Sequence, residues 1–169
     1  AGYATSLSGK WHLGDNYPLR PIDQGFEDAL HHRGGGLAQP ADALDNNRRY
    51  TDAILFHNGV EVQTEGFCMD VYTDHAIDFM RAAVDEGRPF FSYLATNTPH
   101  GPWHDIPEEL YQKYKARDLS EVVPDPKQAD RVARGYAMID NIDQNVGRML
   151  DALDEMGVAD NTIVIYLHD

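Results

Sequence analysis

Four residues of this chain carry side chains suited to the cleavage of an anionic ester, and each follows an expected strand. Lys10 and His12 come after the first β-prone run, His100 follows a later apolar run, and Asp169 follows a β-branched run. In an open α/β sheet, ligands bind beyond the carboxyl ends of the parallel strands. If these strands are parallel neighbours, a lysine, imidazoles and a carboxylate converge on one edge of the sheet.

The chemistry of this set favours an anionic tetrahedral substrate beside a divalent cation. A lysine neutralises substrate oxygens, an imidazole passes a proton to a nucleophile or leaving group, and a carboxylate holds the metal. Each residue taken singly has a simpler explanation: Lys-x-His as a solvated loop, a histidine beside proline as a surface residue, and a final aspartate as a cap. The conjunction at three strand ends is what favours a site.

The elements that would position these residues alternate between strands and helices. The apolar spacing predicts strands at 3–8, 90–96 and 162–167, a hairpin at 54–62 around Asn58-Gly59, and helices at 70–86 and between 128 and 156. A strand, a long helix and a second strand form a right-handed crossover unit. The fold class is therefore predicted to be α/β.

Residues 14–51 break this alternation, because they are rich in Gly, Pro, Asn and Asp. We expect them to be mostly irregular and, since long loops in compact domains usually have a function, to line a site. His31 and His32, and further along Trp103 and His104, are candidates to shape an aryl, sugar or glycan pocket. For the histidines we favour packing or solvent exposure over direct contact with a substrate.

Composition narrows the classes of partner. The chain of 169 residues has a formal net charge of −14, which argues against nucleic-acid binding and against docking on an anionic membrane. It has no apolar run long enough to span a membrane. The single cysteine, Cys68, excludes an internal disulfide and a thiolate zinc cluster, and we expect it to be a buried hydrophobe near a helix start. The acidic surface and scarcity of cysteine are compatible with a secreted or periplasmic bacterial enzyme.

The first strand carries a resemblance to a known family. The stretch Gly2-Tyr3-x-Thr5-x-x-x-Gly9-Lys10-Trp11-His12-Leu13-Gly14 resembles the second signature of the sulfatases, type I sulfate-ester hydrolases of the alkaline-phosphatase superfamily. Four later segments resemble sulfatases in the same order: DQGFE; LFHNGVEV with EGFCMDVYTDHAIDF; FFSYLATNTPHGPWHDIPEELYQKY; and GYAMIDNIDQNVGRMLDALDEMGVADNTIVIYLHD. The resemblance implies a mixed, mainly parallel sheet flanked by helices, incomplete here, with residues 1–169 forming part of one catalytic domain.

The resemblance also implies roles for the four residues. The lysine matching Lys10 contacts the sulfate oxygens, and the histidine matching His12 interacts with a catalytic formylglycine hydrate. The histidine matching His100 binds sulfate and protonates the leaving alcohol, and the aspartate matching Asp169 is a calcium ligand. The implied substrate is a small-molecule or glycan sulfate ester, and no oligomeric state is indicated.

Several parts of the sulfatase site do not occur in the sequence. The C/S-x-P/A-x-R motif that supplies formylglycine is missing, and Cys68 lacks its proline and arginine. The paired calcium-binding aspartates of the first strand, the residue after Asp169 and a later lysine are also missing. We therefore expect an internal part of a catalytic domain that is inactive alone. A phosphate or phosphonate esterase of the same superfamily and a non-catalytic anion-binding module remain alternatives.

Overall fold

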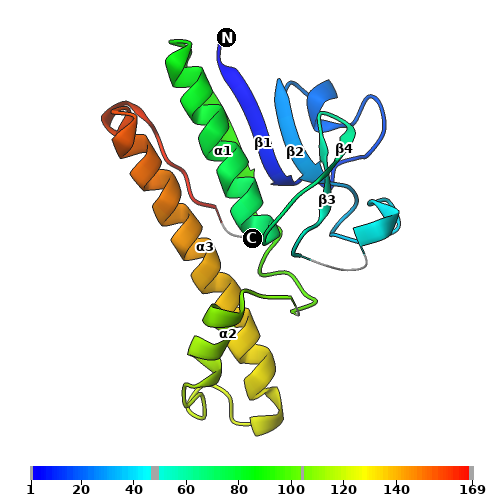
Figure 1. Ribbon diagram of the computed structural model, residues 1–169, viewed down its shortest axis with the longest axis vertical. Coiled ribbons are helices and arrows are strands. Elements are labelled where there is room, and N and C mark those ends of the chain that lie inside the picture. Colours follow the sequence, from blue (N-terminus) through cyan, green and yellow to red (C-terminus); the bar gives the residue numbers. More distant parts are fainter. Residues whose placement is uncertain (1, 47–49, 104, 168–169) are drawn as a thin grey trace.

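The computed structural model describes residues 2–46, 50–103 and 105–167, and its centre is a mixed sheet with strand order β4-β3-β2-β1-β5. Strand β1 runs parallel to both β2 and β5, whereas β2, β3 and β4 are antiparallel neighbours. The predicted α/β class and mixed sheet are confirmed (Figure 1). The strands are β1 (Ala4–Lys10), β2 (Asp28–His32), β3 (Ile54–His57), β4 (Val60–Gln63) and β5 (Phe90–Ala95).

Helices cover one side of this sheet. Helix α1 (Cys68–Asp85) packs against β1 and β5, and the long α3 (Ala129–Glu155) packs beside α1. The short α2 (Glu108–Lys115) packs on the first half of α3, and this pair projects away from the sheet (Figure 1). Among the described residues, no helix combines the length and the apolarity that a membrane crossing requires.

The main core lies between the sheet, the loop that precedes β3, and the helices. It is built mainly from buried apolar side chains, so their burial from water is the main stabilising term. Its buried members are Leu30, Leu37, Tyr50, Ala53, Leu55, Phe67, Cys68, Met69, Tyr72 and Met138. The expectation that Cys68 is a buried residue at a helix start is confirmed.

The hairpin predicted around Asn58-Gly59 is confirmed as β3 and β4. Asn58 and Gly59 have φ angles of 51° and 87°, the positive values that a two-residue type I′ turn requires. The Asn58 side chain also accepts a hydrogen bond from the Ala29 backbone N–H at 2.9 Å. The turn therefore fixes the hairpin against β2.

The strand predicted at 162–167 is wrong. These residues form no strand in the part of the chain that the structure describes, and Ile163 and Leu167 are 88% and 83% exposed. β-Branched residues favour a strand only where a neighbouring strand supplies the hydrogen-bonded ladder, and among the described residues none does. The predicted crossover from β5 through α3 is therefore not completed.

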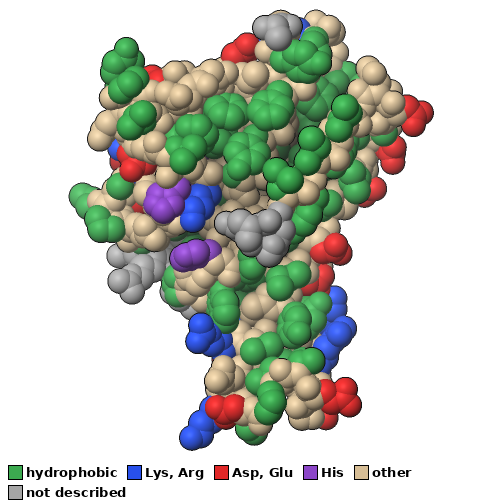
Figure 2. All heavy atoms as spheres, turned by 180° about the vertical axis from the view of Figure 1, so that it is seen from behind, with side chains coloured by type: hydrophobic (Ala, Val, Ile, Leu, Met, Phe, Trp, Pro, Cys, Tyr) green, Lys and Arg blue, Asp and Glu red, His purple; other side chains and the backbone are tan. Residues whose placement is uncertain are grey.

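Strand β5 is parallel to β1, as predicted, but it is not the fully buried strand that its continuous apolar run suggested. Phe91 and Tyr93 are 53% and 45% exposed, because β5 is the last strand of the described sheet and one of its faces is uncovered. Figure 2 shows hydrophobic side chains gathered over a broad part of one face of the molecule.

The 14–51 segment is mostly irregular, as expected, but it also contains β2, a central strand that the pattern did not predict. Asp28–His32 pairs with β1 on one side and β3 on the other. His31 and His32 are 4% and 0% exposed, so packing is confirmed as their environment. Two histidines in a five-residue strand conceal the apolar run that normally indicates a buried strand.

Candidate active site

The carboxyl end of β1 depends on a glycine. Gly9 is paired in register with Ala95 of β5, and a Cβ on Gly9 would lie 1.9 Å from the Ala95 carbonyl oxygen. Its φ of +118° is also one that other residues rarely adopt. The strand predicted at 3–8 extends further than expected, through Gly9. Lys10 is therefore the last residue of β1 rather than a loop residue.

His12 follows in a left-handed conformation, with a φ of 55°. A Cβ added to Gly35 would lie 2.7 Å from His12 Cε1 and 2.8 Å from Nε2, so the imidazole packs directly on this glycine backbone. The Gly35 N–H in turn donates to the Gln39 side-chain oxygen at 3.0 Å. The Gly34–Pro40 turn is thus held against His12, so part of the 14–51 segment lies beside this candidate site residue.

His32 lies beside this end of β1, because it is the register partner of Lys10. Burial, together with the nearby charges of His31, Lys10 and His12, lowers the pKa of His32 to about 3. Its Nδ1 shares a hydrogen bond of 2.9 Å with the Tyr72 hydroxyl. The ring is therefore a neutral, buried group beside the half-buried Lys10.

The loop after β5 presents His100. The Tyr50 hydroxyl donates to the carbonyls of His100 and Gly101 at 3.1 and 3.3 Å. The backbone N–H groups of Tyr50 and Thr51 both donate to Asp105 Oδ2 at 2.8 Å. Burial raises the pKa of Tyr50 to about 12, so its hydroxyl remains a donor at neutral pH. The 50–51 backbone and the 100–105 loop are therefore joined at two points.

The orientation of His100 defines which nitrogen faces the site. Its Nδ1 lies 2.5 Å from the Gly101 carbonyl oxygen. Because a carbonyl only accepts hydrogen bonds, Nδ1 must carry the proton and donate. Nε2 remains for a ligand, and protonation of the ring would place an acidic N–H there.

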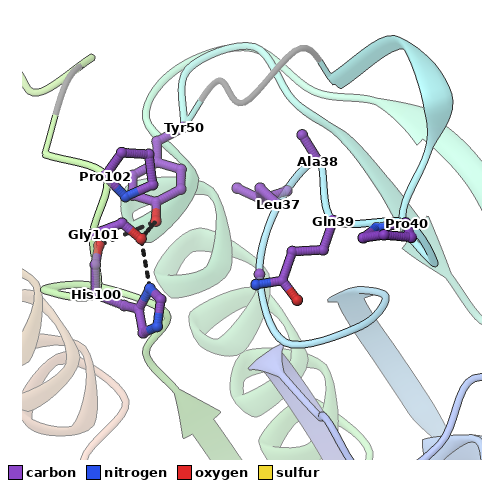
Figure 3. A pocket seen from close by; sticks show the side chains of 9 residues that line it. Leu37, Ala38, Gln39, Pro40, Tyr50, His100, Gly101 and Pro102 are labelled. Atoms are coloured by element: carbon purple, nitrogen blue, oxygen red, sulfur yellow. Dashed lines mark hydrogen bonds between the residues drawn. The ribbon is translucent and has the colours of Figure 1, made fainter.

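A hollow of about 290 Å³ lies beside His100. Figure 3 shows Leu37, Gln39 and Pro40 on one wall, and His100, Gly101 and Pro102 with Tyr50 on the other. The Gly34–Pro40 turn therefore contacts His12 through Gly35 and faces His100 through its later residues. Figure 2 shows histidine and Lys or Arg side chains close together on one face of the molecule.

Of the four predicted site residues, three fall in this region. Lys10 ends β1, His12 follows two residues later, and His100 comes after the parallel neighbour β5. The Gly34–Pro40 turn contacts His12 and faces His100. Asp169 lies outside the described residues, as does His104. The Trp103 indole folds back to donate to the Pro99 carbonyl at 2.5 Å and does not line the hollow.

Two residues of the site were not predicted. Gln39 follows the glycine triplet, which did indicate a loop at the site, but its side chain gave no signal of its own. Tyr50 is 3% exposed, forms part of one wall of the hollow and donates its hydroxyl to backbone carbonyls of the 100–101 loop. No sequence pattern distinguishes such a tyrosine from an ordinary core residue.

The described residues do not assemble a calcium shell. Calcium takes six to eight oxygen ligands, and among the described residues the one close group of three His, Cys, Asp or Glu side chains is Asp28, His57 and His75. Three buried polar atoms near the carboxyl ends of β2 and β5 do lack a partner there: His32 Nε2, Asn97 Nδ2 and Thr98 Oγ1. Further polar groups could pair with these three atoms. None of the three is a carboxylate oxygen, so they do not supply calcium ligands of that kind.

The comparison with known proteins decides the family. The family model named Sulfatase matches residues 1–169. The chain belongs to the sulfatase family. It is 29% identical to the uncharacterized sulfatase YdeN of Escherichia coli K12 over 99% of the chain and 30% of that protein. It is 26% identical to human N-acetylgalactosamine-6-sulfatase over 100% of the chain and 30% of that enzyme.

A solved structure agrees with the fold. The chain superposes on the crystal structure of Ps i-CgsB in complex with k-i-k-neocarrahexaose with a TM-score of 0.70 and 30% identity. The match covers 95% of the chain and 35% of that structure. The chain thus spans about a third of the length of these relatives.

Proposed function

We propose that the protein containing this sulfatase chain hydrolyses the sulfate esters of a glycan. The observation that carries the proposal is the arrangement around the Gly34–Pro40 turn. This turn packs on His12 at the end of β1 and forms one wall of the hollow whose other wall holds His100. His100 lines the hollow, His12 packs on the turn that forms its other wall, and the cation Lys10 lies two residues before His12 at the carboxyl end of β1.

The residues present suit sulfate transfer. We assign Lys10 to the sulfate oxygens, where its charge balances negative charge that grows in the transition state. We assign His100 to the leaving oxygen, with Nε2–H as the acid, because Nδ1 is held by the Gly101 carbonyl. His12, exposed beside the turn, is assigned to the nucleophile and its turnover.

The nucleophile and the metal belong to the proposal too. The C/S-x-P/A-x-R motif is absent from these 169 residues, and we propose that a formylglycine elsewhere in the protein forms the nucleophile. Asp169 is proposed as one ligand of a calcium ion that would offset sulfate charge when bound. Because the described residues do not form its shell, the assignments above do not depend on that ion.

The choice of a glycan follows from the walls of the hollow. Gln39 offers a carboxamide that can both donate and accept, as sugar hydroxyls require, and Leu37 and Pro40 offer apolar surface for a ring face. The names of the relatives agree, since Ps i-CgsB was solved with k-i-k-neocarrahexaose and a second relative is an N-acetylgalactosamine-6-sulfatase.

The test is sulfate release by the full-length protein. We expect turnover of sulfated carrageenan oligosaccharides or N-acetylgalactosamine 6-sulfate, and none of the matching phosphate esters. Lys10→Ala should lower kcat/KM about 10²–10³-fold, the effect of removing one transition-state contact. Lys127→Ala, an exposed lysine on the turn before α3, is the matched control and should change little.

Two outcomes would contradict the proposal. Turnover of phosphate esters with none of sulfate esters would assign the protein to the phosphate branch of the superfamily. A change under about threefold in Lys10→Ala would show that Lys10 does not contact the sulfate, because lost transition-state contacts appear in kcat/KM.

A further inference from the structure

A cluster of two imidazoles and one carboxylate lies away from the candidate active site. Asp28 begins β2, His57 ends β3 and His75 lies in α1. His57 Nε2 is 2.7 Å from Asp28 Oδ1, and His75 Nε2 is 3.0 Å from Asp28 Oδ2. The two rings meet edge to face with centroids 5.3 Å apart. The cluster therefore joins three elements through one carboxylate.

Its position separates it from the proposed sulfate site. The β1–β2 register places His32 beside Lys10, whereas Asp28 is paired with Ser6 at the opposite end of β2. The cluster is also accessible, since the side chains of His57, Asp28 and His75 are 44%, 24% and 16% exposed. A small ion can thus enter from the His57 side without passing the active site.

Further hydrogen bonds orient the cluster. The Ser8 hydroxyl shares a 2.8 Å hydrogen bond with His75 Nδ1, which leaves Nε2 facing Asp28. The Asn58 amide donates to Asp28 Oδ1 at 3.0 Å. Burial raises the pKa of Asp28, but the hydrogen bonds from His75 and His57 outweigh burial and hold it well below its usual range. The carboxylate is therefore ionised and fixed in place.

The same contacts line up Ser8, His75 and Asp28 in the order of a hydrolytic triad. Ser8 is 0% exposed, so no substrate reaches its hydroxyl. The serine instead does what partners of metal-bound histidines do, which is to hold the second ring nitrogen and so set the tautomer. The arrangement favours a metal site over a nucleophile.

We propose that Asp28, His57 and His75 bind a zinc ion. Two imidazole nitrogens and one carboxylate oxygen form a ligand set typical of Zn²⁺, with solvent in the fourth position, whereas Ca²⁺ and Mg²⁺ prefer oxygen ligands throughout. The bound ion ties β2, β3 and α1 together and so stabilises the fold.

The geometry needs only small adjustments. The three ligand atoms lie within 4.8 Å of one another. Tetrahedral zinc at roughly 2.0–2.1 Å from each ligand separates them by about 3.4 Å. His57 Nε2 and His75 Nε2 lie 2.7 and 3.0 Å from the two Asp28 oxygens. These distances must lengthen by about 0.7 and 0.4 Å to reach the tetrahedral separation, and rotation of the partly exposed His57 ring supplies most of that movement.

The test is a Zn²⁺ titration of the full-length protein against a competing chromogenic chelator, with thermal unfolding measured in parallel. We expect His57→Gln and His75→Gln each to weaken binding of one Zn²⁺ at least about tenfold, given that even outer-shell changes cost 10–100-fold. Zn²⁺ should raise the Tm of the wild type and not that of His57→Gln. Ser8→Ala should weaken binding about tenfold through loss of orientation.

The controls separate a metal site from an ion-pair network. Asp78→Asn, an exposed aspartate one turn along α1 from His75, should bind Zn²⁺ as the wild type does. His57→Gln removes a partly exposed ligand and leaves the core intact, so misfolding cannot account for its loss of binding. Zn²⁺ binding that is absent, or that is unchanged in His57→Gln, would overturn the proposal.

Discussion

The Tyr50 hydroxyl and the His100 Nδ1 converge on one acceptor, the carbonyl oxygen of Gly101. Tyr50 comes from the irregular segment after β2, and His100 from the loop after β5. The phenol therefore positions a backbone carbonyl that in turn fixes the tautomer of the imidazole. This relationship makes Tyr50 a positioning residue rather than a catalytic one.

Tyr50→Phe should accordingly impair His100 without unfolding the protein. Loss of one hydrogen bond is worth about 0.5–1.5 kcal/mol, so we expect kcat/KM of the full-length protein to fall about threefold to tenfold. The loss should be larger for a glycan sulfate than for an activated aryl sulfate, since only the former needs the acid. Tyr93→Phe, on the exposed face of β5, is the control. Equal losses on both substrates would show that Tyr50 does not act through His100.

Because His32 is buried, we predict that the folded protein loses stability in mildly acidic solution. Its pKa is about 3 in the fold, mainly because of burial, and about 6.5 in the unfolded chain. The unfolded state therefore binds the extra proton, and stability is lost as pH falls below about 6.5. From pH 7 to pH 5, His32 alone should lower the free energy of unfolding by about 2 kcal/mol.

Urea unfolding at the two pH values measures this effect. His31 shifts in the same direction, because burial also lowers its pKa, so the wild type should lose at least this much. His32→Gln should be less stable at pH 7 but should show a smaller difference between pH 7 and pH 5. An unchanged pH dependence in that variant would show that His32 does not titrate as described.

The Cys68 thiol should be unreactive in the folded protein. Burial raises the pKa of its thiol to about 12, and its Sγ donates to Asn97 Oδ1 at 3.4 Å. Only the thiolate reacts readily, so peptide mapping after alkylation should find Cys68 unmodified in the native state and fully modified in guanidinium chloride. Rapid native labelling of Cys68 would contradict its placement in the core.

The elements that the sequence predicts well are those whose signal is local. The helical spacing of apolar residues in α1 and α3, and the Asn58-Gly59 pair of the hairpin turn, are each signals contained in neighbouring residues. All three elements are present in the structure. The motif around Lys10 likewise indicated a strand, and its Gly9 is needed where β1 meets β5.

The features that it predicts poorly depend on distant partners. Residues 162–167 have the composition of a strand, but a strand forms only beside another, and none of the described strands pairs with it. Strand β2 is not predicted, because two of its five residues are the polar His31 and His32. His32 can be buried there because its ring hydrogen-bonds to Tyr72 of α1, far along the chain. The Asp28–His57–His75 cluster is brought together by three elements and has no spacing signature at all.

The sharpest test of the catalytic assignment concerns His100 in the full-length protein. If its Nε2–H protonates the leaving oxygen, the contribution of His100 to the rate depends on how strongly that oxygen needs a proton. A nitrophenolate leaves well unaided, whereas a sugar alkoxide does not. His100→Ala should therefore cost about 10²–10⁴-fold on a glycan sulfate, the usual contribution of a general acid, and much less on an aryl sulfate. The measurement is the ratio of the two losses in kcat/KM under conditions where chemistry limits the rate. A ratio near one would remove the acid role and leave His100 as a sulfate-binding residue, because the sulfate group is common to both substrates.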